Sequence, residues 1–298
     1  MKKLKEHSLA VYFILLIIFC ALFVLGARML GEKGAYMAQG YMLTPAIAAI
    51  IMRLFFYPLR FKDANLQFGK LKDYFRFWVF SVVLVVIYYF FFSLFGAVSW
   101  DLSGQIFLNR LTEQLASGGQ NIDDTLPPGF TPRMMLILFF IGGLTFFNIV
   151  PGLITGFGEE FGHRGFMLPL LYKMMPRQWF IIGGLIWFAW HLPLVFLIPT
   201  TDDFPFWQDA SNFLILGMGS ICTFIYLSYV YVKSKSVFVT SIVHITMNNA
   251  SAAFSYFVVL ENQILANAGI TLTMMILVLI MYFRKEFAVF NVYFKTDD

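Results

Sequence analysis

Eight stretches of mostly apolar residues, each long enough or nearly long enough to cross a bilayer, dominate this sequence. A helix needs about 20 such residues to span about 30 Å of hydrocarbon. Apolar residues make up 59% of the 298-residue chain and charged residues 13%, whereas soluble domains average about 45–50% and about 25%. We therefore expect an all-α fold, a polytopic transmembrane helix bundle in which residues 1–298 form a single integral membrane domain. The eight expected spans are 9–29, 41–59, 77–98, 134–157, 179–199, 211–232, 237–260 and 264–283.

Basic residues concentrate in alternate loops. If the N-terminus is inside, 15 of the 21 Lys and Arg residues lie in cytoplasmic segments and only four lie outside. Because an excess of Lys and Arg marks cytoplasmic loops, we expect both the N-terminus and the C-terminus to be cytoplasmic. The compact loops favour a bacterial cell inner membrane. The net charge of +4 is too small and too dispersed for a nucleic-acid-binding face, so no nucleic-acid partner is expected.

Polar groups at membrane depth gather in the second half of the chain. Residues 1–133 have almost none and are expected to be scaffold spans, with Arg53 extending along its stem to the membrane surface. Residues 134–260 form the candidate catalytic spans, and residues 261–298 form the last span and the tail. Since ionisable side chains inside a membrane are costly, each one at depth is a functional candidate.

Two adjacent glutamates, Glu159 and Glu160, stand at the inner end of the fourth expected span. Neighbouring residues on a helix point about 100° apart, so the two carboxylates face different surroundings. Glu160 and Arg164 are four residues apart and are expected to form an ion pair, which leaves Glu159 free for chemistry. A charged helix end that only anchors the span is the alternative, and the role of His163 stays open.

Two further polar sites lie in later spans. His191 precedes Leu-Pro in the fifth span, and His244 and Asn248 are one turn apart in the seventh. That spacing lets His244 and Asn248 present two hydrogen-bond donors to a single point. Each site alone is also compatible with an interhelical hydrogen bond. However, three of the four histidines lie in or next to apolar spans, as does the glutamate pair, and a shared intramembrane site explains all of them together.

These residues, in this order, resemble a known family. Glu159-Glu160-x-x-x-Arg164, an aromatic residue three positions before His191, and His244-x-x-x-Asn248 fall on successive spans. This pattern is similar to that of the CAAX protease and bacteriocin-processing family (CPBP, also called Abi), which includes the type II CAAX prenyl endopeptidases. The resemblance covers about 120–130 residues of the second half. The family usually has Phe four residues before the first His, where this chain has Trp187, so we expect an altered pocket shape with the chemistry retained.

The resemblance implies a hydrolase, an intramembrane endopeptidase that cuts a peptide bond of a membrane-associated peptide or protein near the cytoplasmic face. Prenylated and leader-containing peptides are the candidate substrates. Glu159 would activate the attacking water with help from His191. His244 and Asn248 would donate hydrogen bonds to the developing oxyanion. Glu160 and Arg164 would hold the helix end in place.

Other chemistries stay open at this point. Glu159, His191 and His244 also form the Glu-plus-two-His set of a catalytic zinc site, so zinc is a possible cofactor. The motifs of other intramembrane proteases, HExxH on one helix, GxSG, and the paired Tyr-Asp and GxGD set, are absent from the sequence. The alternatives outside proteolysis are an ion-binding transporter and a non-catalytic scaffold or immunity protein. A transporter favours inverted repeats, and the nearly apolar first half opposes that reading.

The depth of Glu159 poses a geometric problem. Counted from Met134, Glu159 is 25 residues along the expected span, about 37 Å on a straight helix. His191 is expected near mid-depth. We therefore expect a bend near Pro151-Gly152, or a deeper start of the fifth span, and a water-filled cavity open to the cytoplasm. Separations above about 10 Å between Glu159 and both histidines would contradict a shared site.

Overall fold

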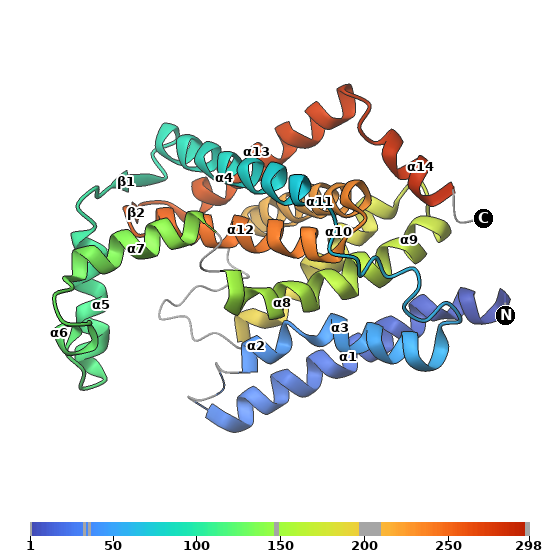
Figure 1. Ribbon diagram of the computed structural model, residues 1–298, viewed down its shortest axis with the longest axis horizontal. Coiled ribbons are helices and arrows are strands. Elements are labelled where there is room, and N and C mark those ends of the chain that lie inside the picture. Colours follow the sequence, from blue (N-terminus) through green and yellow to red (C-terminus); the bar gives the residue numbers. More distant parts are fainter. Residues whose placement is uncertain (1, 32–33, 35–36, 146–148, 197–209, 296–298) are drawn as a thin grey trace.

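The computed structural model describes residues 2–31, 34, 37–145, 149–196 and 210–295. Helices account for nearly all of this part of the chain, as the composition predicts, and Figure 1 shows them packed as a bundle. The helices are α1 (Lys2–Leu30), α2 (Met37–Tyr41), α3 (Thr44–Ile51), α4 (Leu71–Leu94), α5 (Gln105–Ser117), α6 (Ile122–Thr125), α7 (Pro132–Leu144), α8 (Ile149–Gly162), α9 (Leu168–Met174), α10 (Trp179–His191), α11 (Ala210–Ser234), α12 (Val237–Ser255), α13 (Gln263–Phe283) and α14 (Ala288–Lys295).

Five of the described helices are long and apolar enough to cross a membrane. The chain is therefore an integral membrane protein, while the count of eight spans and the cytoplasmic termini stay predictions. Two further apolar helices, Pro132–Leu144 and Trp179–Leu194, are shorter than a full span. The five candidate spans are Ser8–Leu30, Met37–Phe56, Leu71–Leu94, Asn212–Ser234 and Gln263–Phe283.

The expected continuous span over 134–157 is wrong. α7 ends at Leu144, where Thr145 adopts an extended conformation, and α8 begins at Ile149. Close packing accompanies this end, because a Cβ on Gly143 would lie 2.8 Å from the carbonyl oxygen of Asn249 on α12. Glu159 is thus ten residues from the start of its own helix, about 15 Å along the axis, and the depth problem disappears.

The end of the expected span 237–260 also differs. α12 ends at Ser255, and Val258–Leu260 forms strand β2. β2 pairs antiparallel with β1 (Val98–Trp100), with Val98 opposite Leu260. This short ribbon joins the end of α4 to the start of α13.

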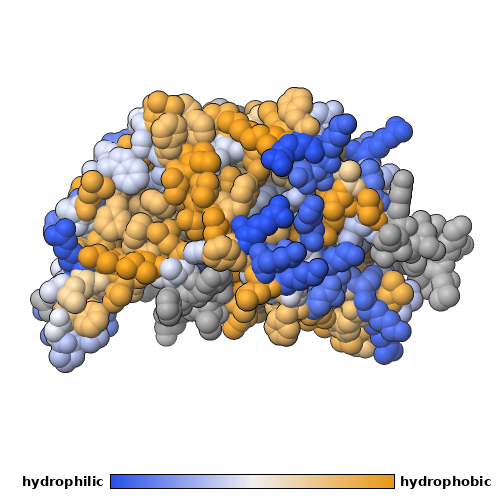
Figure 2. Space-filling model, turned by 45° about the horizontal axis from the view of Figure 1, so that its top comes forward, coloured by the Kyte–Doolittle hydropathy of each residue, from blue (hydrophilic) through white to orange (hydrophobic). Residues whose placement is uncertain are grey.

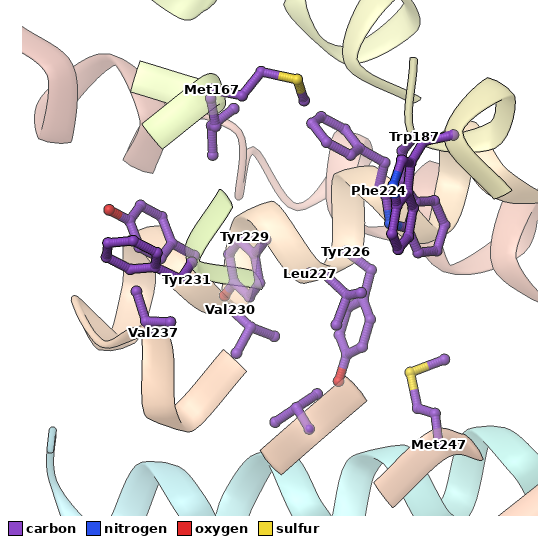
Figure 3. Close-up of a cluster of buried hydrophobic side chains, with 14 of the residues drawn as sticks. Met167, Trp187, Phe224, Tyr226, Leu227, Tyr229, Val230, Tyr231, Val237 and Met247 are labelled. Atoms are coloured by element: carbon purple, nitrogen blue, oxygen red, sulfur yellow. The ribbon is translucent and has the colours of Figure 1, made fainter. Parts of the chain in front are cut away.

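α12 occupies the middle of the bundle. It packs against α8, α4, α7 and α11, as Figure 1 shows. α10 packs on α11, and α3 packs on α8. Aromatic and aliphatic side chains from α10, α11 and α12 fill the core between them (Figure 3). The helix that carries the glutamates is therefore held between α3 and α12.

Arg53 is buried, which contradicts the expectation that it reaches the membrane surface. It is 1% exposed and lies in a π-helical turn, Met52–Phe56. Its Nη1 donates to Asp63 Oδ1 at 2.6 Å and its Nη2 donates to the carbonyl oxygen of Gly165 at 2.6 Å. Tyr57 donates to the other oxygen of Asp63 at 2.8 Å. The carboxylate of Asp63, in the following loop, compensates for the buried charge of Arg53. Arg53 thereby links this loop to the turn that follows α8.

Replacing Arg53 with Met is expected to destabilise the protein by about 2–4 kcal/mol. The substitution leaves the carboxylate of Asp63 without its cation and the carbonyl of Gly165 without its donor. Denaturant unfolding in detergent micelles measures the loss. Lys62→Met is the matched control, because Lys62 is exposed in the same loop and its removal changes the charge equally. Equal stability of the two variants would contradict a buried brace at Arg53.

Candidate active site

Glu159 and Glu160 lie in the last turn of α8. Both are completely buried, with 0% exposure. Small residues allow this placement, because a Cβ on Gly162 would lie 2.4 Å from the carbonyl carbon of Pro45 on α3. Beyond Gly162 the helix continues as a π-helical turn, His163–Met167, into α9. The glutamates thus lie at the end of α8 that packs closely against α3.

Glu160 forms its charge pairs through one oxygen, and its Oε2 has no hydrogen-bond partner among the described residues. Its Oε1 lies 2.9 Å from Nη1 of Arg164 and 2.8 Å from Nδ1 of His244. The ion pair expected from the i,i+4 spacing is therefore present. The guanidinium of Arg164 lies over the rings of Trp187 and Phe224, 5.1 Å and 4.7 Å from their centroids. A buried carboxylate so neutralised is expected to fix the position of the groups around it.

Glu159 lies between the two imidazoles. Its Oε1 accepts a hydrogen bond from Nε1 of Trp187 and is 3.7 Å from Nε2 of His191. Its Oε2 is 3.9 Å from Nδ1 of His244. Within the described residues, this Oε2 has no hydrogen-bond partner. The distances satisfy the requirement for a shared site, and one carboxylate oxygen stays available.

The tautomer of His191 follows from its backbone contact. Nδ1 lies 2.8 Å from the carbonyl oxygen of Trp187. Since a carbonyl only accepts, Nδ1 carries the hydrogen, and in the neutral ring Nε2 presents a lone pair toward Glu159. The side chain of His191 is 31% exposed. The site therefore has one imidazole open to the surroundings, next to a buried carboxylate.

Asn248 stands apart from the other predicted residues. It lies one turn from His244 on α12 and is exposed. Across the described part of the chain, no hydrogen bond joins its side chain to the glutamates or the histidines. The structure brings together five of the six side chains predicted from sequence, and leaves Asn248 at the edge. The five are Glu159, Glu160, Arg164, His191 and His244.

His163, whose role the sequence leaves open, lies in the turn after α8. It is 0% exposed, and neither ring nitrogen has a hydrogen-bond partner among the described residues. Its ring packs edge-on against Trp190 at 5.1 Å between centroids. In this position it packs against α10 and forms no hydrogen bond with the glutamates.

Trp187 has a role that sequence reasoning missed. The sequence predicts only that Trp187, in the place of the family's usual Phe, alters the shape of the pocket. In the structure, the indole N–H of Trp187 donates a hydrogen bond to Glu159. Its carbonyl also holds His191. The signal was present in the spacing, because Trp187 precedes His191 by one helical turn and therefore shares its face.

Replacing Trp187 with Phe is expected to lower kcat between about 10- and 100-fold. The ring and its packing are kept, but the donor to a carboxylate, a stronger hydrogen bond than one between neutral groups, is lost. Steady-state cleavage of a tethered peptide gives kcat and KM separately. The Phe188→Leu variant controls for a general change in the apolar packing of α10. An unchanged kcat in Trp187→Phe would show that the indole N–H does not orient the carboxylate.

One group of side chains in the described residues has the geometry to hold a metal ion. Ligand atoms of Glu159, Glu160 and His244 all lie within 4.8 Å of one another. This set differs from the expected one, since Glu160 takes the place of His191. Two carboxylates and an imidazole fit the donor types of a catalytic zinc site. The guanidinium of Arg164, 2.9 Å from Glu160, opposes a second positive charge at the same carboxylate.

Comparison with known proteins bears on the segment that carries this site. Residues 134–250 match the model of a family described as type II CAAX prenyl endopeptidase Rce1-like. A search of curated proteins finds no match to the chain. The matched segment contains most of α7, all of α8, α9, α10 and α11, and most of α12. All six predicted site residues lie within it. Residues 134–250 are therefore similar to the Rce1-like type II CAAX prenyl endopeptidase family, and the motifs in this segment predict the same family.

Proposed function

We propose that this protein is an intramembrane endopeptidase that hydrolyses a peptide bond of a membrane-associated substrate near the cytoplasmic face, using a water activated by Glu159. One observation carries the proposal. A buried carboxylate with a free oxygen lies 3.7 Å and 3.9 Å from two imidazoles, while the adjacent Glu160 is neutralised by Arg164. Adjacent carboxylates in such different surroundings are typical of divided roles in acid–base catalysis.

The attacking water is held between Glu159 and His191. Glu159 Oε1 and His191 Nε2 are both acceptors at a separation of 3.7 Å, and a separation above about 3.5 Å suits a bridging water that donates to each. As the water oxygen attacks the peptide carbonyl carbon, its proton passes to Glu159. When the tetrahedral intermediate collapses, the C–N bond breaks and Glu159 returns that proton to the leaving amine.

The oxyanion is stabilised from α12. Nδ1 of His244 is engaged with Glu160 at 2.8 Å, so Nε2 is the nitrogen that faces the substrate. To donate from Nε2 as well, the ring must be the imidazolium, which carboxylates 2.8 Å and 3.9 Å away stabilise. Asn248, one turn along and exposed, adds its amide once the substrate is bound.

Asn248→Ala is expected to lower kcat about 10²–10³-fold, the usual cost of removing one oxyanion donor. The loss falls on kcat because the interaction strengthens in the transition state. Stability should stay at the wild-type value, since this side chain is exposed. Asn249→Ala, on another face of α12, is the control. A wild-type kcat in Asn248→Ala would remove Asn248 from the mechanism.

The substrate class follows from where the site lies. An intramembrane site admits a peptide held at the bilayer, and the matched family is named for prenylated C-terminal peptides. A prenylated tail is therefore the first substrate to test and a leader-containing peptide the second. The distribution of basic residues supports cytoplasmic termini, and the compact loops support a bacterial inner membrane.

The test is cleavage of matched peptides by the purified protein in lipid nanodiscs. One fluorogenic peptide carries a farnesylated C-terminal cysteine, one lacks the lipid, and one is a leader peptide anchored by an apolar segment. Cleavage of any tethered peptide, lost in Glu159→Gln, is expected. Absence of cleavage across all three, with a folded protein, would contradict the proposal.

A metal-dependent version rests on the grouping of Glu159, Glu160 and His244 within 4.8 Å. A zinc ion held by these residues would polarise the water or the carbonyl when bound. Metal analysis of the purified protein and its activity after dialysis against a chelator separate the versions. Activity that survives with substoichiometric metal supports the glutamate mechanism. Activity lost with the metal and restored by zinc supports the metal mechanism.

A further inference from the structure

A groove separate from the candidate active site runs along the outside of the bundle. α4 and α13 form its walls, and Tyr226 and Tyr229 of α11 line its floor. Its volume is about 570 Å³. None of the six predicted site residues lines it.

The walls of the groove face the bilayer. α4 and α13 are two of the five candidate spans. Wall residues such as Val83 on α4 and Ile276 and Ile280 on α13 are 47%, 39% and 50% exposed. Figure 2 looks onto this side of the molecule and shows hydrophobic surface that meets a hydrophilic area. Within a membrane, the hydrocarbon chains of lipids are available to fill such a groove.

One end of the groove is positively charged. Arg76 lies near the start of α4, and Arg284 follows the end of α13 directly. Both residues line the groove. The one acid that lines it, Glu286, is already paired, because Tyr229 donates to it at 2.9 Å and Lys233 lies 3.6 Å away. The two arginines therefore give this end an excess of positive charge.

The length of the groove matches one leaflet. Arg76 and Phe91 both line it from α4, and fifteen residues of helix measure about 22 Å. Half of a bilayer, with its polar region, is about 20–22 Å thick. A lipid whose headgroup is at Arg76 would thus extend its chain along the groove to the bilayer midplane.

We propose that this groove binds an anionic phospholipid, with the phosphate at Arg76 and Arg284 and one acyl chain between α4 and α13. Arginine binds phosphate through paired N–H donors. The orientation predicted from the basic residues puts this end at the cytoplasmic leaflet, where anionic lipids create a negative surface potential.

The experiment measures lipid binding to the full chain in detergent by native mass spectrometry. Phosphatidylglycerol and phosphatidylcholine with identical chains are titrated onto wild type, Arg76→Gln/Arg284→Gln, and the control Lys72→Gln/Lys285→Gln. Lys72 and Lys285 are exposed neighbours of the two arginines and lie outside the groove lining. Phosphatidylglycerol affinity should fall about 30-fold in the arginine pair and less than threefold in the lysine pair. Equal losses in both pairs would assign the attraction to diffuse surface charge and overturn the proposal.

A second arm tests the chain. Ile276→Trp fills the groove and should weaken phosphatidylglycerol at least fivefold, while circular dichroism shows an unchanged helix content. Soluble glycerol phosphate should compete poorly with the lipid. Full competition by glycerol phosphate, or unchanged lipid affinity in Ile276→Trp, would reduce the site to a phosphate contact and overturn the lipid assignment.

Discussion

Replacing Glu159 with Gln is expected to reduce cleavage at least about 10³–10⁴-fold while the bundle stays folded. Gln keeps the size of the side chain and an oxygen that accepts from Trp187, but it cannot take a proton from water or return one to the leaving amine. General acid–base catalysis by one group contributes about 10²–10⁴-fold, and in the proposed mechanism Glu159 serves both steps. Single-turnover cleavage in nanodiscs measures the chemical step without interference from product release.

The stability of this variant is the control. Among the described residues, Glu159 forms no ion pair within hydrogen-bond distance, since both imidazoles are more than 3.5 Å away. Unfolding of Glu159→Gln should therefore follow that of the wild type. Residual cleavage above one-tenth of the wild-type rate would assign the base to another residue.

Replacing the adjacent Glu160 with Gln is expected to destabilise the protein by about 3–5 kcal/mol. The change leaves the guanidinium of Arg164, 0% exposed, without its counter-charge, and removing one partner of a buried ion pair has this cost. It also removes the negative charge that faces Nδ1 of His244. Denaturant unfolding in detergent measures the loss.

A double variant that removes both charges of the ion pair distinguishes a structural role of Glu160 from a catalytic one. In Glu160→Gln/Arg164→Met the buried cation is removed together with its partner, so much of the stability should return. Equal stability of Glu160→Gln and wild type would show that the ion pair is not what supports the helix end. Glu159→Gln is thus predicted to lose cleavage activity with its stability unchanged, whereas Glu160→Gln is predicted to lose stability.

The sequence predicts the local part of this site well, for a physical reason. The pairing of Glu160 with Arg164 depends on helix periodicity alone, and it is present at 2.9 Å. The prediction that Glu159 lies close to His191 and His244 assumed that the polar groups share one site. This inference is sound because isolated ionisable groups are costly inside a membrane. Both are properties that a pattern of residues carries without tertiary detail.

Features that depend on tertiary contacts could not be predicted. Arg53 is buried because Asp63 and the carbonyl of Gly165 approach it, and neither contact follows from spacing. The end of α7 at Leu144, with Thr145 extended, lies inside an apolar run of sequence that predicts a continuous helix. The hydrogen bond from the indole of Trp187 to Glu159 joins α10 to α8, and spacing along the chain does not predict it. The role of Asn248 stays a prediction.

The two hydrogen bonds of Trp187 affect how constant the geometry of the site is. The carbonyl oxygen of Trp187 accepts a hydrogen bond from His191, and its indole N–H donates one to Glu159. One residue of α10 therefore contacts both the imidazole and the carboxylate. We therefore expect a small movement of α10 to carry the carboxylate and the imidazole together. In the proposed mechanism, this shared contact would keep the distance between the two groups nearly constant while the helices move.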